Sequence, residues 1–196
     1  MPLGSYAHVH RGVATGANDF FILSRDEARI RGLERHTRPC LVRAAEVITA
    51  GGVVRAGKLD HVLLDTGIGA NDAALHAYVK EGQRRGAHQR YLCSHRKPWW
   101  RVGGSPPPPI VATYMARQAP VFAVNPERCQ IVNVFHGIHF REAVDESIVW
   151  ALTDWLNANR ETLLGGRTYQ GGLRKFEPAD LEAILVPPPH RLCCSE

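Results

Sequence analysis

One segment of the chain combines basic side chains with aromatic rings. Residues 84–101 contain six basic side chains and no acidic one, with two histidines, a tyrosine and two tryptophans among them. Guanidinium and ammonium groups neutralise phosphates, and flat rings stack on bases or sugars. Arg96, Lys97, Trp99 and Trp100 are therefore candidate nucleic-acid contacts. The two tryptophans suit a hydrophobic core equally well.

A second segment, residues 167–175, reads RTYQGGLRK. Gly171 and Gly172 allow backbone N–H groups to approach an anion, and the three basic side chains around them have no acidic neighbour in the segment. The pattern predicts a phosphate contact. An ordinary β-turn is the alternative.

Residues 64–69, LDTGIG, imitate a cofactor loop. A strand, a D-x-G-x-G turn and a helix in this order are typical of S-adenosylmethionine sites, where glycines let the backbone approach the ligand. Such a site also needs an acidic side chain at the end of the next strand. No Asp or Glu occurs between Glu81 and Glu127. A plain turn is favoured, and S-adenosylmethionine binding at Asp65–Gly69 is kept as the enzymatic alternative.

Other patterns give no catalytic constellation. Residues 125–128, NPER, begin like the N-P-P-aromatic loop that grips a flipped adenine, but they lack the second proline and the aromatic residue, so they predict a hairpin turn. Four histidines, His8, His10, His136 and His139, have no cysteine or carboxylate partner at ligand spacing, and we expect no metal site. No glycine-flanked serine nucleophile or nuclease-like acidic cluster is found.

The elements that must position these residues follow from periodicity and turn signals. Extended segments are expected at residues 9–15, 20–23, 61–65, 91–102, 110–115, 122–125 and 130–140, the last two paired through the turn at 125–127. Helices are expected at residues 25–31, capped by Ser24, at 71–83, capped by Asn71, at 144–157, with Trp155 in the core, and at 178–184, started by Pro178. The fold class is α+β: one mixed domain over residues 1–196, with a largely antiparallel sheet and a few flanking helices. Its core spans about residues 6–187, and residues 188–196 form a frayed tail.

Composition limits the partners and the compartment. The chain has 196 residues, 44% of them hydrophobic, and a formal net charge of +5. The first half carries a balance of +6 and the second half −1, and 20 of the 24 basic residues are Arg, which suits phosphate and guanine edges, although a coding bias toward Arg explains the composition as well. Five cysteines without C-x-x-C spacing fit a reducing cytoplasm, and no apolar run has the length of a membrane span.

Five segments stand out along the chain, in this order: RGVATGANDFF, KPWW, TYMARQAPVFAVN, NVFHGI and RTYQGGLRKFEPADL. Together they resemble the C-terminal target-recognition domain of the adenine-N6 DNA methyltransferases of restriction-modification systems, the TaqI-like specificity domain. The resemblance covers about residues 6–187. It implies a module that grips and reads duplex DNA, while a separate catalytic domain or subunit binds S-adenosylmethionine and transfers the methyl group. The chain alone is then not an enzyme and needs no cofactor.

The resemblance also implies roles for particular residues. In the opening segment, Arg11 would meet a phosphate or a base edge, Thr15 and Asn18 would offer hydrogen bonds, and Gly12 and Gly16 would let the backbone approach DNA. The remaining candidates for DNA contact are Arg96, Lys97, Trp99, Trp100, Tyr114, Arg117, Asn133, His136, Arg167, Tyr169, Gly171, Gly172 and Lys175. Glu177 and Pro178 are expected to be structural. A general single-strand-binding module using the tryptophan-rich segment remains a further alternative.

Overall fold

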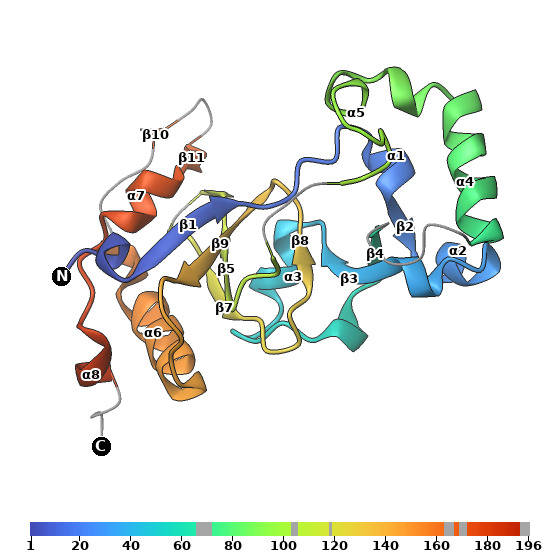
Figure 1. The fold of residues 1–196 in the computed structure, drawn as a ribbon. Helices are drawn as coiled ribbons and strands as arrows, with labels where there is room; N and C mark the ends of the chain where they lie inside the picture. Colours follow the sequence, from blue (N-terminus) through green and yellow to red (C-terminus); the bar gives the residue numbers. More distant parts are fainter. Residues whose placement is uncertain (66–71, 103–105, 118, 163–166, 169–171, 193–196) are drawn as a thin grey trace.

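The first strand of the chain is an edge strand of its main sheet (Figure 1). This sheet is antiparallel, and its strands in spatial order are β1 (Ala7–Arg11), β9 (Phe135–Phe140), β5 (Ile110–Thr113) and β7 (Phe122–Val124). Alternate residues of a strand point to opposite faces, so Ala7 and Val9 are buried on one side while His8 and His10 point to the other. Arg11, at the end of β1, lies on the same side as Val9.

The computed structural model describes residues 1–65, 72–102, 106–117, 119–162, 167–168 and 172–192. Two further sheets occur among these residues. One orders its strands as β2 (Ile22–Ser24), β4 (His61–Leu64), β3 (Thr37–Leu41) and β8 (Gln130–Ile131), with β3 and β8 parallel. The other orders them as β10 (Arg167–Thr168), β11 (Arg174–Lys175) and β6 (Met115–Ala116).

Helices surround these sheets, which confirms the α+β class. The described α-helices are α1 (Asn18–Phe21), α2 (Arg25–Ile30), α3 (Ala44–Ile48), α4 (Ala73–Arg84), α5 (Tyr91–Ser94), α6 (Glu146–Asn159), α7 (Pro178–Glu182) and α8 (Pro189–Leu192). Short 3-10 helices occupy Leu3–Ser5, Glu34–His36, Ala56–Lys58, Ala87–Gln89 and Arg160–Thr162. No described helix has the length and hydrophobicity needed to cross a membrane.

Buried side chains gather in three clusters. The first packs α1 and α4 against the β4 sheet around Phe21 and Trp99, and the second packs α6 and α7 against one face of the β1 sheet around Leu152 and Phe122. The third lies beneath α3, around Phe135.

Local signals predicted several elements correctly. Ser24 Oγ accepts a hydrogen bond from the Glu27 N–H at 3.0 Å and begins α2, as its capping sequence indicates. Pro178 begins α7, and α6 lies within two residues of the predicted helix. The cap of α4 was misplaced: Asp72 accepts from the backbone N–H groups of Ala74 and Leu75. Asn71 lies outside the described residues.

Two expected strands and one expected strand pairing were wrong. Residues 20–23 divide into the end of helix α1 and the start of β2. Residues 91–102 form helix α5 and turns in place of a strand. Residues 122–125 and 130–140 do not pair with each other, because β7 pairs with β5, β8 with β3, and β9 with β1 and β5. In each case non-local partners override the local pattern.

Two burial expectations also need correction. The tail beyond residue 187 is not frayed throughout, since Leu192 in α8 is only 6% exposed and packs in the second cluster. Residues 193–196 lie outside the described part of the chain. Trp155 is half-buried and packs against the edge of the core cluster instead of filling it.

Candidate nucleic-acid interface

The end of β1 brings together side chains from three distant parts of the sequence. The guanidinium of Arg11 lies over the ring of Tyr114, 4.3 Å from its centroid, and Lys175 Nζ lies 5.3 Å from the same centroid. Glu177 pairs with both cations, at 3.8 Å from Arg11 and 2.5 Å from Lys175. We call Arg11, Tyr114, Lys175 and Glu177 the β1-end cluster. Its two cations and one carboxylate leave an excess of positive charge beside an aromatic ring.

Hydrogen bonding fixes the charges in this cluster. The bond from Lys175 lowers the pKa of Glu177, and the same bond raises the pKa of Lys175. Both groups are therefore ionised at neutral pH. Arg11 and Glu177 each keep about two-fifths of their side-chain surface exposed. An anion approaching from solvent can reach Arg11 directly and competes with Glu177 for it.

His136 supports this cluster from within the fold. Its side chain is fully buried, and its ring meets the Tyr114 ring edge to face at 5.1 Å. Nε2 lies 2.7 Å from the carbonyl oxygen of Phe176, so Nε2 donates and carries the proton. Burial lowers the pKa of His136, which keeps the ring neutral. His136 is thus placed to orient Tyr114, and it has no exposed surface with which to touch DNA.

The opening loop, residues 12–17, leaves β1 directly after Arg11 and is held from one side by Arg96. The two terminal nitrogens of Arg96 donate to the carbonyl oxygens of Thr15 and Ala14, each at 2.6 Å. The Thr15 side chain is 1% exposed and bonds within the loop to Asn18 and to the backbone N–H of Ala17. Arg96 therefore anchors the loop. Asn18 remains exposed at the start of α1.

Glycines in this loop serve the protein's own packing. A Cβ on Gly12 would lie 2.3 Å from the carbonyl oxygen of Val132, so the chain passes directly against the backbone at the end of β8. Gly16 has φ +78°, a left-handed conformation, and a Cβ on it would lie 2.6 Å from Leu92 Cβ. The sequence interpretation assigned both close approaches to DNA, whereas here the close neighbours are backbone and side chain of the same chain.

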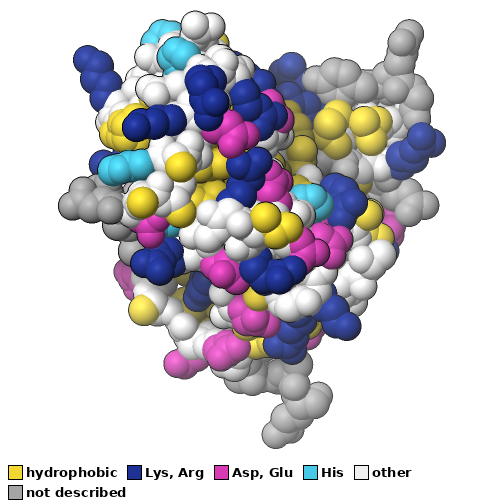
Figure 2. Space-filling view, turned by 90° about the vertical axis from the view of Figure 1, so that its right-hand side faces the viewer, with side chains coloured by type: hydrophobic (Ala, Val, Ile, Leu, Met, Phe, Trp, Pro, Cys, Tyr) yellow, Lys and Arg dark blue, Asp and Glu magenta, His cyan; other side chains and the backbone are white. Residues whose placement is uncertain are grey.

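Two arginines of the basic segment, Arg85 and Arg90, form ion pairs. Arg90 binds the carboxylate of Asp19 and lowers its pKa, and Arg85 lies 3.4 Å from Glu81. Figure 2 shows the face at the α4 end of the molecule, where basic and acidic side chains alternate. Basic and acidic side chains are therefore mixed on this face.

Of the two tryptophans, one belongs to the core. Trp99 is 9% exposed and packs with Phe20 and Phe21 at centroid distances of 4.9 and 6.5 Å. Trp100 is half-buried and Lys97 is exposed, so their contact with DNA stays a prediction. Trp99 has too little free surface to stack on a base.

The other candidate residues lie on several different segments of the chain. Arg117 and Asn133 are exposed, and the Asn133 N–H donates to the carbonyl of Val13 in the opening loop at 3.1 Å. Arg167 pairs through its backbone with Lys175, so β10 places it beside the cluster. Gly172 is exposed with φ +74°. Tyr169 and Gly171 lie outside the described residues.

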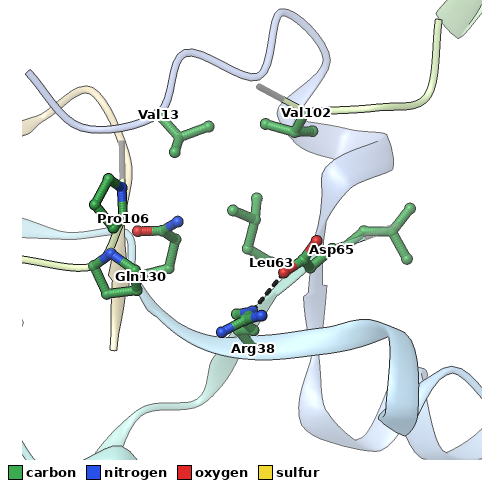
Figure 3. A pocket seen from close by; sticks show the side chains of 9 residues that line it. Val13, Arg38, Leu63, Asp65, Val102, Pro106 and Gln130 are labelled. Carbon is green, nitrogen blue, oxygen red and sulfur yellow. Dashed lines mark hydrogen bonds and ion pairs between the residues drawn. The ribbon is translucent and has the colours of Figure 1, made fainter. Parts of the chain in front are cut away.

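A pocket of ≈ 330 Å³ lies beneath the opening loop (Figure 3). Val13 and Val102 form one side of it, and Gln130 and the ion pair between Arg38 and Asp65 form the other. Asp65 thus ends β4 paired to an arginine of the neighbouring strand. Because β4 is antiparallel to both of its neighbours, it lacks the parallel doubly wound setting in which a cofactor loop works. Residues 66–69 of that loop lie outside the described part of the chain.

A row of histidines crosses the opposite face of β1 and β9. The His10 ring stacks on His8 at 5.9 Å and lies tilted against His139 at 5.8 Å. Arg141 donates to His8 Nε2 at 2.7 Å, so that nitrogen is unprotonated. In the part of the chain that the structure describes, no group of three potential ligands is arranged to hold a metal ion.

This row makes stability depend on pH. Burial first, and then electrostatic repulsion from His10, Arg128 and His8, lowers the pKa of His139 to about 4. The unfolded chain takes up this proton near pH 6.5, so the free energy of unfolding should fall by about 1 kcal/mol between pH 7.5 and 5.5. Urea denaturation at the two pH values measures it. His139→Asn is the control that should reduce the dependence, and the part that remains belongs to the buried His136, whose pKa is also lowered. The carboxylates with lowered pKa values change the free energy of unfolding only at pH values below 5.5. Equal midpoints at both pH values would contradict the assignment.

Comparison with solved structures identifies the class of fold. The chain is similar to part of the type IIG restriction endonuclease BpuSI, with a TM-score of 0.61 and 12% identity, over 98% of this chain and 25% of that one. Residues 1–195 match the family described as the C-terminal domain of type II methyltransferase M.Eco57I, and the chain belongs to this family. This confirms the resemblance at the level of a methyltransferase C-terminal domain.

Two relatives agree with this assignment. The chain is 36% identical to type II methyltransferase M.XamI of Xanthomonas campestris pv. amaranthicola and 28% identical to type II methyltransferase M.AccI of Acinetobacter calcoaceticus. Each match covers 95% of this chain and 36% of the relative. The chain therefore spans about a third of the length of these relatives.

Sequence reasoning missed two features of the site. Glu177 was assigned to the start of α7, where it indeed lies, but it also neutralises part of the β1-end cluster. Its spacing of two from Lys175, typical of one strand face, was the available signal. The anchoring of the opening loop by Arg96 had no sequence signal, because about 80 residues separate the partners.

Proposed function

We propose that this chain is the target-recognition module of an adenine-N6 DNA methyltransferase of a restriction-modification system. It binds duplex DNA in a sequence-specific way and acts in the cytoplasm beside a catalytic domain or subunit. That partner holds S-adenosylmethionine and transfers the methyl group. The observation that carries the proposal is the β1-end cluster next to an anchored, partly exposed loop, in a member of a methyltransferase C-terminal family.

The cluster and the loop suit different parts of DNA. Arg11 and Lys175 are held by Tyr114 and Glu177 at fixed positions, which suits phosphates of the backbone and sets the register of the module. The exposed Asn18 follows the loop directly. Its amide oxygen accepts from Thr15, and its amide NH2 group can donate to a base edge. In this arrangement affinity comes mainly from the cluster, and sequence discrimination comes from the loop and its neighbours.

A selection from random duplexes tests the proposal. At ~0.1 M salt the sequence-independent phosphate contribution is partly suppressed, so a specific module enriches one motif. The expected result is a single motif that contains an adenine. Isothermal titration should detect no S-adenosylmethionine binding by the chain alone. Recovery of duplexes without any shared motif, or preference for single strands, would overturn the specific-reading role.

Charge changes in the cluster should act in opposite directions. Lys175→Ala removes a phosphate contact and is expected to weaken binding to all duplexes alike and to lower the salt slope by about 1. Glu177→Gln removes the carboxylate that competes with phosphate, and it should tighten binding by about twofold to fivefold, the size of one exposed ion pair. Binding at 50–200 mM salt, followed by fluorescence anisotropy, measures both.

The matched control is Lys58→Ala. Lys58 is an exposed lysine in the 3-10 helix at Ala56–Lys58 and belongs to neither the cluster nor the opening loop. This variant should leave the salt slope unchanged. If Lys175→Ala and Lys58→Ala have the same effect, or if Glu177→Gln weakens binding, then the cluster is not the phosphate contact.

A further inference from the structure

A second surface lies along α6 and residues 187–192. In Figure 1, α6 and α8 are drawn below β1 and the β10–β11 hairpin above it. Helix α6 and residues 187–192 enclose a groove of ≈ 1080 Å³. Its lining is mainly apolar and includes Trp150, Trp155, Ala158, Pro187 and Leu192.

The groove has the composition of a protein-binding surface. Trp150 and Trp155 are both half-buried, so each ring packs against the core on one side and keeps free surface on the other. Large aromatic side chains in a concave apolar patch are the usual anchors of protein interfaces. Asp154 and Arg191 also line the groove and are exposed. Charged residues around an apolar centre are typical of such interfaces.

The beginning of the chain lies against the same wall. The backbone nitrogen of Met1 donates to the carbonyl of Val186 at 2.8 Å, and the Val186 N–H donates back to Met1 at 2.9 Å. The Tyr6 hydroxyl donates to the carbonyl of Pro187 at 3.3 Å, and Pro187 lines the groove. In a longer chain, whatever precedes residue 1 would therefore enter beside the groove.

We infer that the α6 groove binds the catalytic part of the methyltransferase. This rests on the proposed function, and it names the surface by which the recognition module is attached. The matching family is a C-terminal domain and the match covers 36% of each relative, so the greater part of such a relative precedes this region. In a longer chain, that part connects to residue 1 beside the apolar groove, so it is the nearest partner for the groove. The occupant is an apolar segment of the catalytic part.

A chimera tests the inference. In it, residues 1–196 replace the matched region of M.XamI, and hydrogen exchange is compared between the chimera and the isolated chain. Docking should slow exchange of residues 147–158 and 187–192 roughly tenfold. Ala158→Glu, which places a charge in the groove at an exposed position without removing core packing, should abolish that protection. Ala77→Glu, at an exposed position of α4, is the matched control and should retain it.

Other results would overturn the inference. Equal exchange of α6 in the chimera and in the isolated chain excludes docking at the groove. Protection in the isolated chain that increases with concentration identifies a second copy of the chain as the occupant. The Ala158→Glu variant of the isolated chain should select the same DNA motif as the parent, so a failure of docking is distinguishable from a failure of DNA reading.

Discussion

Replacing Trp99 by alanine is expected to lower the free energy of unfolding by about 3–5 kcal/mol, the usual cost of truncating a buried aromatic side chain. Trp99 packs against Phe20, Phe21 and the ring of His88. Gly82 faces it so closely that a Cβ there would lie 2.9 Å from the indole. The cavity left by alanine lies between α1, α4 and the β4 sheet and cannot collapse without moving them. Urea denaturation measures the loss.

Two variants make this result specific. Trp100→Ala, at the neighbouring half-buried ring, should cost less than half as much. Trp99→Phe keeps part of the packing and removes the indole N–H, which is buried without a hydrogen-bond partner in the structure, so it should recover part of the loss. A stable Trp99→Ala protein that has lost single-strand binding would instead support a base-stacking role for this residue.

Gly12→Ala should destabilise the protein by about 3 kcal/mol, at the upper end of what added volume in a packed interior costs. The new Cβ would lie 2.3 Å from the carbonyl oxygen of Val132 and 2.7 Å from that of Ile131. Backbone hydrogen bonds hold this part of the chain in place, because Gly12 donates to the carbonyl of Phe135 at 2.9 Å and Val13 donates to the carbonyl of Ile131 at 2.8 Å. The backbone has to move, since no flexible side chain can give way.

The same substitution should also weaken DNA binding. Gly12 follows Arg11 and is the first residue of the opening loop, so a shift of its backbone separates the β1-end cluster from Asn18. Gly57→Ala is the matched control, because a Cβ at Gly57 meets no atom within 4 Å and the residue has no left-handed φ. Thermal unfolding and duplex binding of the two variants measure the effect. A Gly12→Ala protein as stable as Gly57→Ala would show that a Cβ at position 12 can be accommodated.

Local sequence signals determined the elements whose geometry is local. The capping sequence at Ser24 and the proline at 178 fix where α2 and α7 begin, because a cap or a missing N–H acts within one turn of helix. The spacing of apolar residues in α6 likewise predicts the face that it buries. Arg11, Tyr114, His136 and Lys175 were also selected from sequence, and the structure brings them together.

Only the tertiary structure decides which of the charged and aromatic side chains keep exposed surface for a binding partner. Arg90 and Arg96 look alike in sequence, yet one pairs with Asp19 and the other holds the carbonyl of Thr15, in both cases far along the chain. Trp99 and Trp100 are adjacent, and one fills the core. Strand pairing of β9 with β1 and β5 was hidden for the same reason. Burial and pairing depend on contacts between distant segments, and the residue types in one window do not specify them.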